Sequence, residues 1–248
     1  MPKTLIPVIT IDGPAGSGKG TIARQVASIL NYHYLDSGAL YRILGLMSQQ
    51  HNVELDDIQG LIKLCAEMEV RFDFGVQNIG ASQQDIYRQD LEIQKNVLQE
   101  NVPVYLNGSE VASDLRTEEC AGRASQLAAL AEVRAALLDK QRSFRQSPGL
   151  VAEGRDMGTV VFPDAKCKIF LTASPHERAL RRQKQLKKQG ISASLGSLLT
   201  EIETRDSRDQ NRKVSPLRPA ADALLVDSTK LSIDQVVNQI IEMVQGGQ

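Results

Sequence analysis

Short apolar runs alternate along this chain with longer amphipathic segments. The first run, residues 5–11, is almost wholly apolar and rich in β-branched residues, which is typical of a strand buried on both faces of a parallel sheet. Four later segments share this character: residues 32–35, 150–152, 167–171 and 223–226. Helical patterns separate these segments, so the sequence predicts an α/β fold with a five-stranded parallel sheet flanked by helices.

Helical periodicity covers most of the remaining chain. From residue 19, apolar residues recur at helical spacing on one face: Ile22, Val26, Ile29 and Leu30. Four further helices are predicted, at residues 39–50, about 117–145, 175–189 and 197–207.

The last helix has the clearest pattern. Ser232 and Gln235 stand at the spacing of a capping box, and an apolar stripe runs from Ile233 to Val244. We therefore expect this helix to begin directly after Ser232 and to pack one face on the core.

The stretch between the second and third predicted strands interrupts this alternation of buried strands and helices. Residues 70–74 and 102–106 alternate in the manner of strands, and Asn107-Gly108 is typical of a hairpin turn. We expect a small α+β insert at residues 62–114, within a core made of residues 1–61 and 115–248.

The composition argues against several classes of protein. The formal net charge of -1 over 248 residues does not favour a nucleic-acid or membrane binder. The three cysteines are far apart and odd in number, which suggests neither a disulfide framework nor a zinc site. The N-terminus lacks a secretory pattern, and no run approaches the roughly 20 apolar residues of a membrane helix. We expect a soluble, cytoplasmic monomer without nucleic-acid or membrane partners.

A glycine-rich segment follows the first predicted strand and opens the first helix. It matches the G-x-x-x-x-G-K pattern and comprises Gly13, Pro14, Ala15, Gly16, Ser17, Gly18, Lys19, Gly20 and Thr21. Glycines let backbone N–H groups converge on phosphate oxygens, and the helix presents its positive end to them. Lys19 supplies charge to the β and γ phosphates, and Thr21, displaced by Gly20, is the nearest hydroxyl for Mg²⁺. The segment predicts binding of a nucleoside triphosphate.

Polar residues also follow two other predicted strands, at the sheet edge where open α/β sheets bind ligands. Ser37 is a plausible helix N-cap, and Arg42 lies one turn further on, where it suits an acceptor phosphate. The strand at 150–152 runs directly into Glu153, Arg155 and Asp156. Arg155 is a candidate for the acceptor phosphate and Asp156 for the amino group of a base. Glu153 is a candidate for holding Mg²⁺ through water.

The segment from Glu177 to Arg218 is strongly basic, with eleven Lys/Arg against five acids. Its arginines recur at helical spacing in two groups, Arg178, Arg181 and Arg182, then Arg205, Arg208 and Arg212. Two cationic helices around a turn at Gly190 predict a lid that closes on the transferring phosphoryl group. A nucleic-acid groove is the alternative, which the 4% of aromatic residues and the lack of Trp disfavour.

Five motifs in this order resemble the bacterial cytidylate kinase (CMP/dCMP kinase) family: GPAGSGKGT, YLDSGALYR, VAEGRDMGTVVFPDA, RDSRDQNR and PAADALLVDST. The resemblance covers nearly the whole chain. It implies a P-loop nucleoside-monophosphate-kinase fold, with an inserted acceptor-binding domain and a helical lid at about 175–192. It also implies transfer of the ATP γ-phosphate to CMP or dCMP, with Mg²⁺.

The resemblance also implies roles for individual residues. Contacts to the acceptor phosphate are implied for Ser37, Arg42 and Arg155, and contacts to cytosine for Ser125, Arg134, Asp156 and Arg212. Ribose contacts are implied for Arg205 and Asp209, and contacts of the closing lid with ATP for Arg178, Arg181 and Arg182. Together with Lys19 and Arg155, the three lid arginines form the implied catalytic set.

The chain departs from the family pattern at two places. Glu153 stands where the family often has Asp, which lengthens the reach but keeps the charge. The insert around residues 77–101 is longer than in many relatives.

The predicted chemistry is direct in-line transfer, in which the acceptor phosphate oxygen is the nucleophile and no strong base is required. One alternative is a related kinase acting on UMP or shikimate. Another is a nucleotide-dependent switch or nucleic-acid-binding NTPase, although the sequence has no clear acidic Walker B strand end or GTPase base motif.

Overall fold

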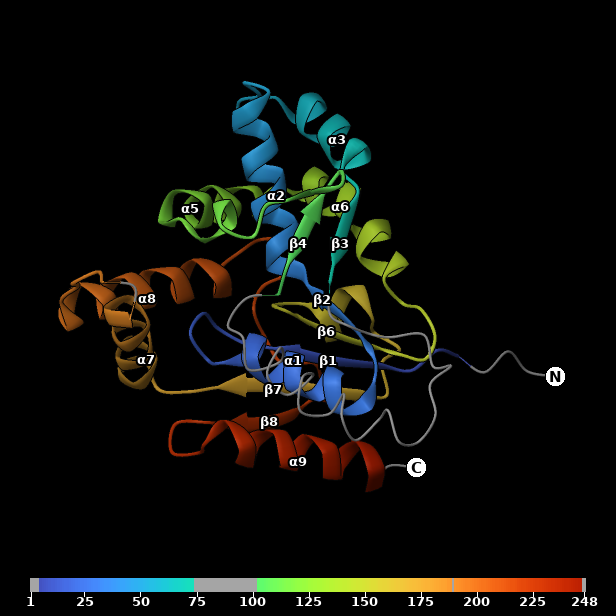
Figure 1. The fold of residues 1–248 in the computed structure, drawn as a ribbon, viewed down its shortest axis with the longest axis vertical. Coiled ribbons are helices and arrows are strands. Elements are labelled where there is room, and N and C mark those ends of the chain that lie inside the picture. Colours follow the sequence, from blue (N-terminus) through green and yellow to red (C-terminus); the bar gives the residue numbers. More distant parts are fainter. Residues whose placement is uncertain (1–4, 74–101, 189, 247–248) are drawn as a thin grey trace. The chain divides into compact units, whose positions relative to one another are not determined.

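The computed structural model describes residues 5–73, 102–188 and 190–246. Its main sheet is parallel and five-stranded, in the order β2-β6-β1-β7-β8, with helices around it (Figure 1). The strands are β1 (Val8–Asp12), β2 (His33–Asp36), β6 (Leu150–Gly154), β7 (Cys167–Thr172) and β8 (Leu224–Asp227). All five strands predicted from the sequence are confirmed, with their ends shifted by a few residues.

The chain divides into two compact units, each of which is discontinuous in sequence. One unit comprises Met1–Pro7 and Ala27–Val151, and the other comprises Val8–Val26 and Ala152–Gln248. We call them the first and the second unit. No helix within the described ranges is both long and apolar enough to cross a membrane.

The second unit contains the centre of the sheet. Ile11 of β1 pairs with Ile169 of β7, and Leu171 of β7 pairs with Val226 of β8. Along α9 (Ile233–Gly246), which lies beside β8 in Figure 1, Val236, Val237 and Ile240 are buried.

The predicted capping box of α9 is confirmed. The Ser232 backbone N–H donates to Gln235 Oε1 at 2.9 Å, and the Gln235 N–H donates to Ser232 Oγ at 3.2 Å. The first turn of the helix thereby gains acceptors for donors that have no partner within the helix.

Helices α7 (Pro175–Lys188) and α8 (Leu195–Gln210) also belong to the second unit and confirm two predicted helices. They pack on each other through a small apolar cluster of Ala179, Leu186, Leu198 and Ile202. The two helices are also joined by the ion pair of Arg178 and Asp206.

The first unit is mainly helical, with α2 (Ser37–Gln50), α3 (Ile58–Glu67), η1 (Asp114–Arg116), α5 (Glu118–Leu127) and α6 (Ala131–Ser143). The sequence did not indicate α3. The single helix expected at about 117–145 was wrong, because the chain turns at Ala128 and is extended at Leu130. Arg134 stabilises this break by donating to the Ala128 carbonyl at 3.1 Å, which satisfies an acceptor at the end of α5.

Two details of the predicted helices also differ. The N-cap of α2 is Asp36 rather than Ser37, since the Asp36 carboxylate accepts from the Ala39 N–H at 3.0 Å. In α1 (Lys19–Leu30), Ile22 and Val26 are buried as expected, but Ile29 is exposed.

The expected hairpin is confirmed as part of a small antiparallel sheet of β3 (Val70–Phe72), β4 (Val104–Leu106) and β5 (Ser109–Glu110). Asn107 and Gly108 connect β4 to β5 with φ values of 48° and 85°, the positive values that a two-residue hairpin turn requires. The prediction of a longer insert at residues 77–101 lies outside the described residues.

Candidate functional site

The glycine-rich segment joins the end of β1 to the first turn of α1. A side chain at Gly13 would overlap the Leu171 carbonyl oxygen, while Gly16 and Gly18 have φ values of 75° and 88°. Glycine adopts such φ values, and lies this close to neighbouring backbone, at lower cost than residues with a side chain. Ser17 is fully buried, and its hydroxyl has no hydrogen-bond partner among the described residues. The geometry is that of a loop shaped for phosphate oxygens at a helix N-terminus.

Lys19 is the first residue of α1, and its side chain turns back over the loop. Its ammonium donates to the Pro14 carbonyl at 3.3 Å and lies 3.9 Å from the Glu153 carboxylate at the end of β6. A Cβ at Gly20 would come within 2.8 Å of Glu153 Oε1. The glycine that separates Lys19 from Thr21 therefore leaves room for this carboxylate.

The residues predicted to hold Mg²⁺ fit a hard cation. Thr21 presents a hydroxyl, which accepts from Arg24 at 3.4 Å, and Glu153 presents a buried carboxylate near the same turn of α1. Oxygen ligands of these kinds are the ones that Mg²⁺ prefers.

Asp12, the last residue of β1, was not anticipated as part of the site. Its two carboxylate oxygens accept from the backbone N–H groups of Met157 and Gly158, each at 2.8 Å. Burial raises the pKa of Asp12 to about 7, against the lowering effect of these two hydrogen bonds. Its position directly before Gly13, at the end of a buried strand, is the sequence signal that could have identified it.

Arg155 and Asp209 come together from the end of β6 and the last turn of α8. Arg155 Nε donates to Asp209 Oδ2 at 2.8 Å. Burial would raise the pKa of Asp209, but the Arg155 guanidinium, with Arg212 and Arg205 nearby, holds it below the usual 3.8. Asp156, the next residue along the chain, is buried, and its charge contributes to the raised pKa of Asp12.

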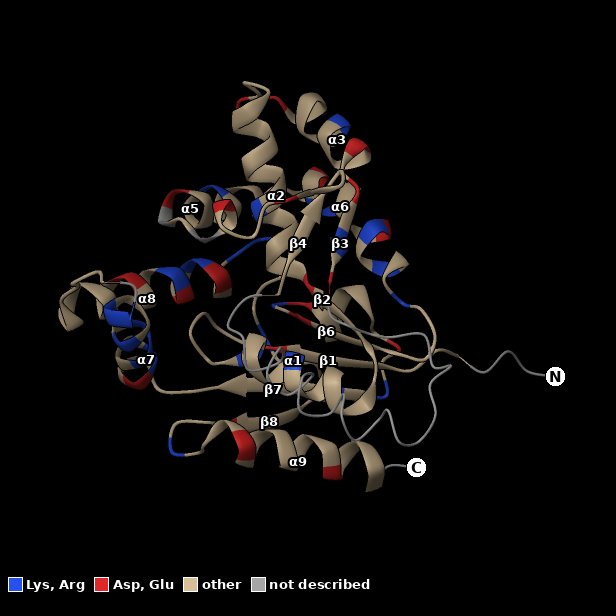
Figure 2. Ribbon diagram, viewed as in Figure 1, with Lys and Arg blue, Asp and Glu red and all other residues tan. Residues whose placement is uncertain are grey.

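Two of the three predicted lid arginines contact the glycine-rich segment, residues 13–21, which we call the phosphate loop. Arg178 is buried and donates to the Ala15 carbonyl at 3.1 Å, to the Ala173 carbonyl at 3.0 Å and to both oxygens of Asp206. Arg182 instead donates to Gln185 on its own helix at 3.0 Å. Acidic residues accompany the basic ones along α7 and α8 (Figure 2), so the predicted cationic faces are partly neutralised.

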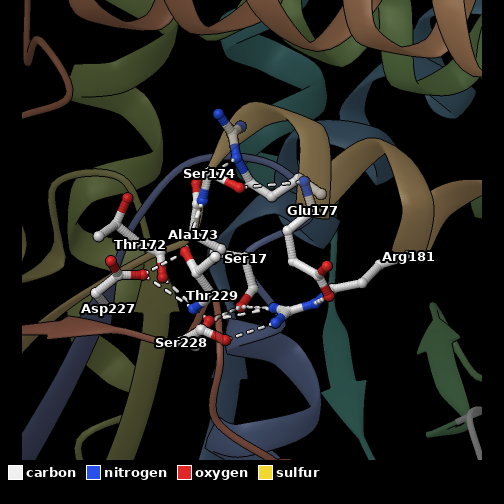
Figure 3. A network of polar contacts seen from close by, with 10 residues as sticks. Ser17, Thr172, Ala173, Ser174, Glu177, Arg181, Asp227, Ser228 and Thr229 are labelled. Atoms are coloured by element: carbon white, nitrogen blue, oxygen red, sulfur yellow. Dashed lines mark hydrogen bonds and ion pairs between the residues drawn. The ribbon is translucent and has the colours of Figure 1, made fainter.

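Arg181 is the centre of a polar network that joins three segments of the second unit (Figure 3). Its guanidinium donates to the Ser17 carbonyl at 3.3 Å and to the Ser228 carbonyl at 2.7 Å, while Glu177 accepts from its Nε at 3.0 Å. The Thr229 hydroxyl accepts from the Ser174 N–H at 2.9 Å. The loop after β8 begins within the last of the five family motifs, at Ser228 and Thr229, and is thus connected to both the phosphate loop and α7.

The other predicted acceptor residues belong to the first unit. Ser37 Oγ is buried and accepts from Gln141 at 2.8 Å, a partner that the sequence did not indicate. Arg42 donates to the Leu115 carbonyl at 3.3 Å. Arg134 lies over the Tyr41 ring, 5.7 Å from its centroid, and Ser125 lies on α5, half-buried.

Comparison with known proteins identifies the family of the chain. A family model described as cytidylate kinase matches residues 9–246. The chain is 50% identical over 241 residues to a cytidylate kinase of Nitrosococcus oceani, covering 97% of each chain. It is also 50% identical over 240 residues to one from Colwellia psychrerythraea, covering 97% of this chain and 96% of the relative. These matches span both compact units, and the chain therefore belongs to the cytidylate kinase family.

Proposed function

We propose that this protein transfers the γ-phosphate of ATP to CMP or dCMP, giving ADP with CDP or dCDP. The observation that carries the proposal is the phosphate loop of β1 and α1, with Lys19 folded over it and Glu153 beside it. Membership of the cytidylate kinase family supports the choice of acceptor.

The donor triphosphate would bind to the N–H groups of the loop and to Lys19. These groups stabilise the negative charge that spreads over the transferring phosphoryl group. Thr21 would hold Mg²⁺, with Glu153 assisting through water, and the ion would neutralise phosphate charge when bound.

The acceptor would bind through the residues that the family resemblance implies. Its phosphate would contact Ser37, Arg42 and Arg155, and its cytosine would contact Ser125, Arg134, Asp156 and Arg212. Its ribose would contact Arg205 and Asp209. Because an ionised phosphate oxygen is the nucleophile, these residues act by orienting it in line with the donor rather than by removing a proton.

We assign the lid to residues 175–192, the acceptor-binding insert to residues 62–114, and the core to residues 1–61 and 115–248. Arg178, Arg181 and Arg182 would add positive charge on the donor side, and the contacts of Arg178 and Arg181 with the phosphate loop support this. Lid closure would exclude water and suppress hydrolysis of ATP. We also propose that the protein is a monomer in the cytoplasm, whose reducing conditions fit the three free cysteines.

An acceptor panel tests the proposal. ADP release from ATP and Mg²⁺ is measured with CMP, dCMP, UMP, AMP, shikimate or no acceptor, and the products are separated by chromatography. We expect CDP or dCDP as the dominant product. Preferential turnover of UMP or shikimate would identify a related kinase. Acceptor-independent hydrolysis without CDP would refute the kinase assignment, and salt-sensitive DNA or RNA binding would favour a nucleic-acid-dependent NTPase.

A further inference from the structure

We infer that Asp12 is a positioning residue for the acceptor, because it fixes the segment of Arg155 and Asp156 to the end of β1, directly beside the phosphate loop. The inference rests on the proposed roles of Arg155 and Asp156 as acceptor-binding residues. Asp12 itself touches neither nucleotide in the proposed mechanism.

Asp12 lies between two segments that the proposed mechanism uses. It directly precedes Gly13, the first residue of the phosphate loop. Its carboxylate holds the N–H groups of Met157 and Gly158, which directly follow Arg155 and Asp156. The Asp12 side chain therefore connects the phosphate loop to the backbone that carries Arg155 and Asp156, the two residues proposed to bind the acceptor.

Asp12 also completes the local structure of the segment that it binds. Met157 and Gly158 begin η2 (Met157–Val161), a single π-helical turn whose first N–H groups have no partner within the turn. The turn closes when the Asp156 carbonyl accepts from the N–H groups of Val160 and Val161. Asp12 thus acts as the N-terminal cap of this turn from a distant strand, and fixes where the turn begins.

The same segment makes a second contact with β1. Thr10 and Asp12 project on the same face of the strand, two residues apart. A Cβ at Gly158 would lie 2.9 Å from Thr10 Oγ1, a buried hydroxyl without a hydrogen-bond partner among the described residues. The backbone at Gly158 is therefore seated closely on β1 as well as bonded to it.

The electrostatics support a geometric role. Burial makes the ionised form of Asp12 unfavourable, and among the charged groups near it Asp156 raises its pKa while Arg155 lowers it. A charged carboxylate at this position opposes folding, yet it is the group that can accept from two N–H donors at once. We therefore assign the Asp12 carboxylate a role in positioning η2.

The main test is Asp12→Asn, which is nearly isosteric. The amide has one acceptor oxygen, so one of the two N–H groups loses its partner and faces a donor. We expect the KM for CMP to rise about tenfold, as for one lost hydrogen bond, while the KM for ATP changes less than about twofold. Asp234→Asn, at an exposed carboxylate of α9, is the matched control with the same change of charge, and it should leave both KM values unchanged.

A pH profile separates positioning from a general structural role. The ratio of wild-type to Asp12→Asn kcat/KM for CMP should increase as pH rises through about 7, because the ionised carboxylate holds both N–H groups more strongly. The titration of nucleotide phosphate near pH 6 is common to both enzymes and cancels in the ratio. A folded Asp12→Asn enzyme with an unchanged KM for CMP, or a flat ratio, would overturn the inference.

A second variant keeps the test decisive if Asp12→Asn does not fold. Gly158→Ala retains Asp12 but forces η2 away from Thr10, and it should also raise the KM for CMP. Adding Thr10→Ala removes the obstructing hydroxyl and should restore the KM, whereas no effect of Gly158→Ala would count against the inference.

Arg155→Ala distinguishes a failure of the proposed acceptor role of Arg155 from a failure of the positioning role of Asp12. If it leaves the KM for CMP unchanged, the proposed acceptor role fails; if it raises that KM while Asp12→Asn does not, only the role of Asp12 fails.

Discussion

Arg155 and Asp209 form a buried ion pair between the end of β6 and the last turn of α8, with 2.8 Å between Nε and Oδ2. Their side chains are only 17% and 9% exposed. Both are proposed to bind the acceptor, Arg155 its phosphate and Asp209 its ribose. In the proposed mechanism Asp209 would orient the guanidinium before the acceptor arrives, which would reduce the ordering cost of binding.

Arg155→Ala should lower kcat/KM for CMP by roughly a hundredfold or more, because a charged donor to the acceptor phosphate is lost. The effect is measured in a coupled ADP-release assay with ATP saturating. Lys63→Ala, at an exposed lysine of α3, is the control and should match the wild type. A near-normal rate for a folded Arg155→Ala enzyme would remove Arg155 from the proposed site.

Lys19→Met should lower kcat by about a hundredfold to a thousandfold, since methionine keeps an apolar stem but cannot stabilise the phosphate charge. Circular dichroism and the melting temperature of the variant show whether the fold is intact. Normal turnover in a folded variant would contradict the donor assignment of the phosphate loop.

Two ion pairs of α7 should differ in their contribution to stability. Arg178 and Asp206 are 3% and 15% exposed, whereas Arg181 and Glu177 are 29% and 32% exposed. Asp206→Ala leaves a buried guanidinium without its carboxylate and should lower the free energy of unfolding by about 3 kcal/mol or more. Glu177→Ala should lower it by less than about 1 kcal/mol. Urea unfolding measures both, and equal losses would be inconsistent with this difference in burial.

Asp12 should make stability depend on pH in an unusual direction for a carboxylate. Its pKa is about 7 in the folded protein and 3.8 as the reference for the unfolded chain, so the folded state binds more protons between these values. Its contribution is fully present below pH 3.8 and is lost as pH rises through about 7. The unfolding free energy of the wild type minus that of Asp12→Asn should therefore fall across this window, as measured by urea unfolding. An increase across the window would refute the raised pKa.

Local patterns predicted the strands and most helices well. The buried strands are apolar runs, and the cap of α9 depends on Ser232 and Gln235, which are three residues apart. The break between α5 and α6 was missed because the apolar pattern continues through it. At that break the Ala128 carbonyl accepts from the side chain of Arg134 in the next helix, a contact that the apolar pattern does not reveal.

The residues of the candidate site likewise divide into those that a local pattern predicts and those that only the fold brings together. The phosphate loop could be identified from its sequence because all of its parts are contiguous and their spacing reflects one local conformation. The resemblance to a family then added acceptor residues, including Ser125 and Arg134, which no local pattern marked. Gln141 was not identified by either route, because its link to Ser37 joins residues 104 positions apart.

The sequence by itself determined where the five sheet strands lie along the chain and where the glycine-rich turn joins a strand to a helix, since these depend on neighbouring residues. Only the tertiary structure decided which charges meet. Asp12 bonds a backbone N–H 145 residues away, Arg155 pairs with Asp209 across 54 residues, and Arg178 bonds Ala15 across 163 residues. Such partners are selected by the packing of the whole unit, in which a buried donor or charge must find its complement wherever the fold places one.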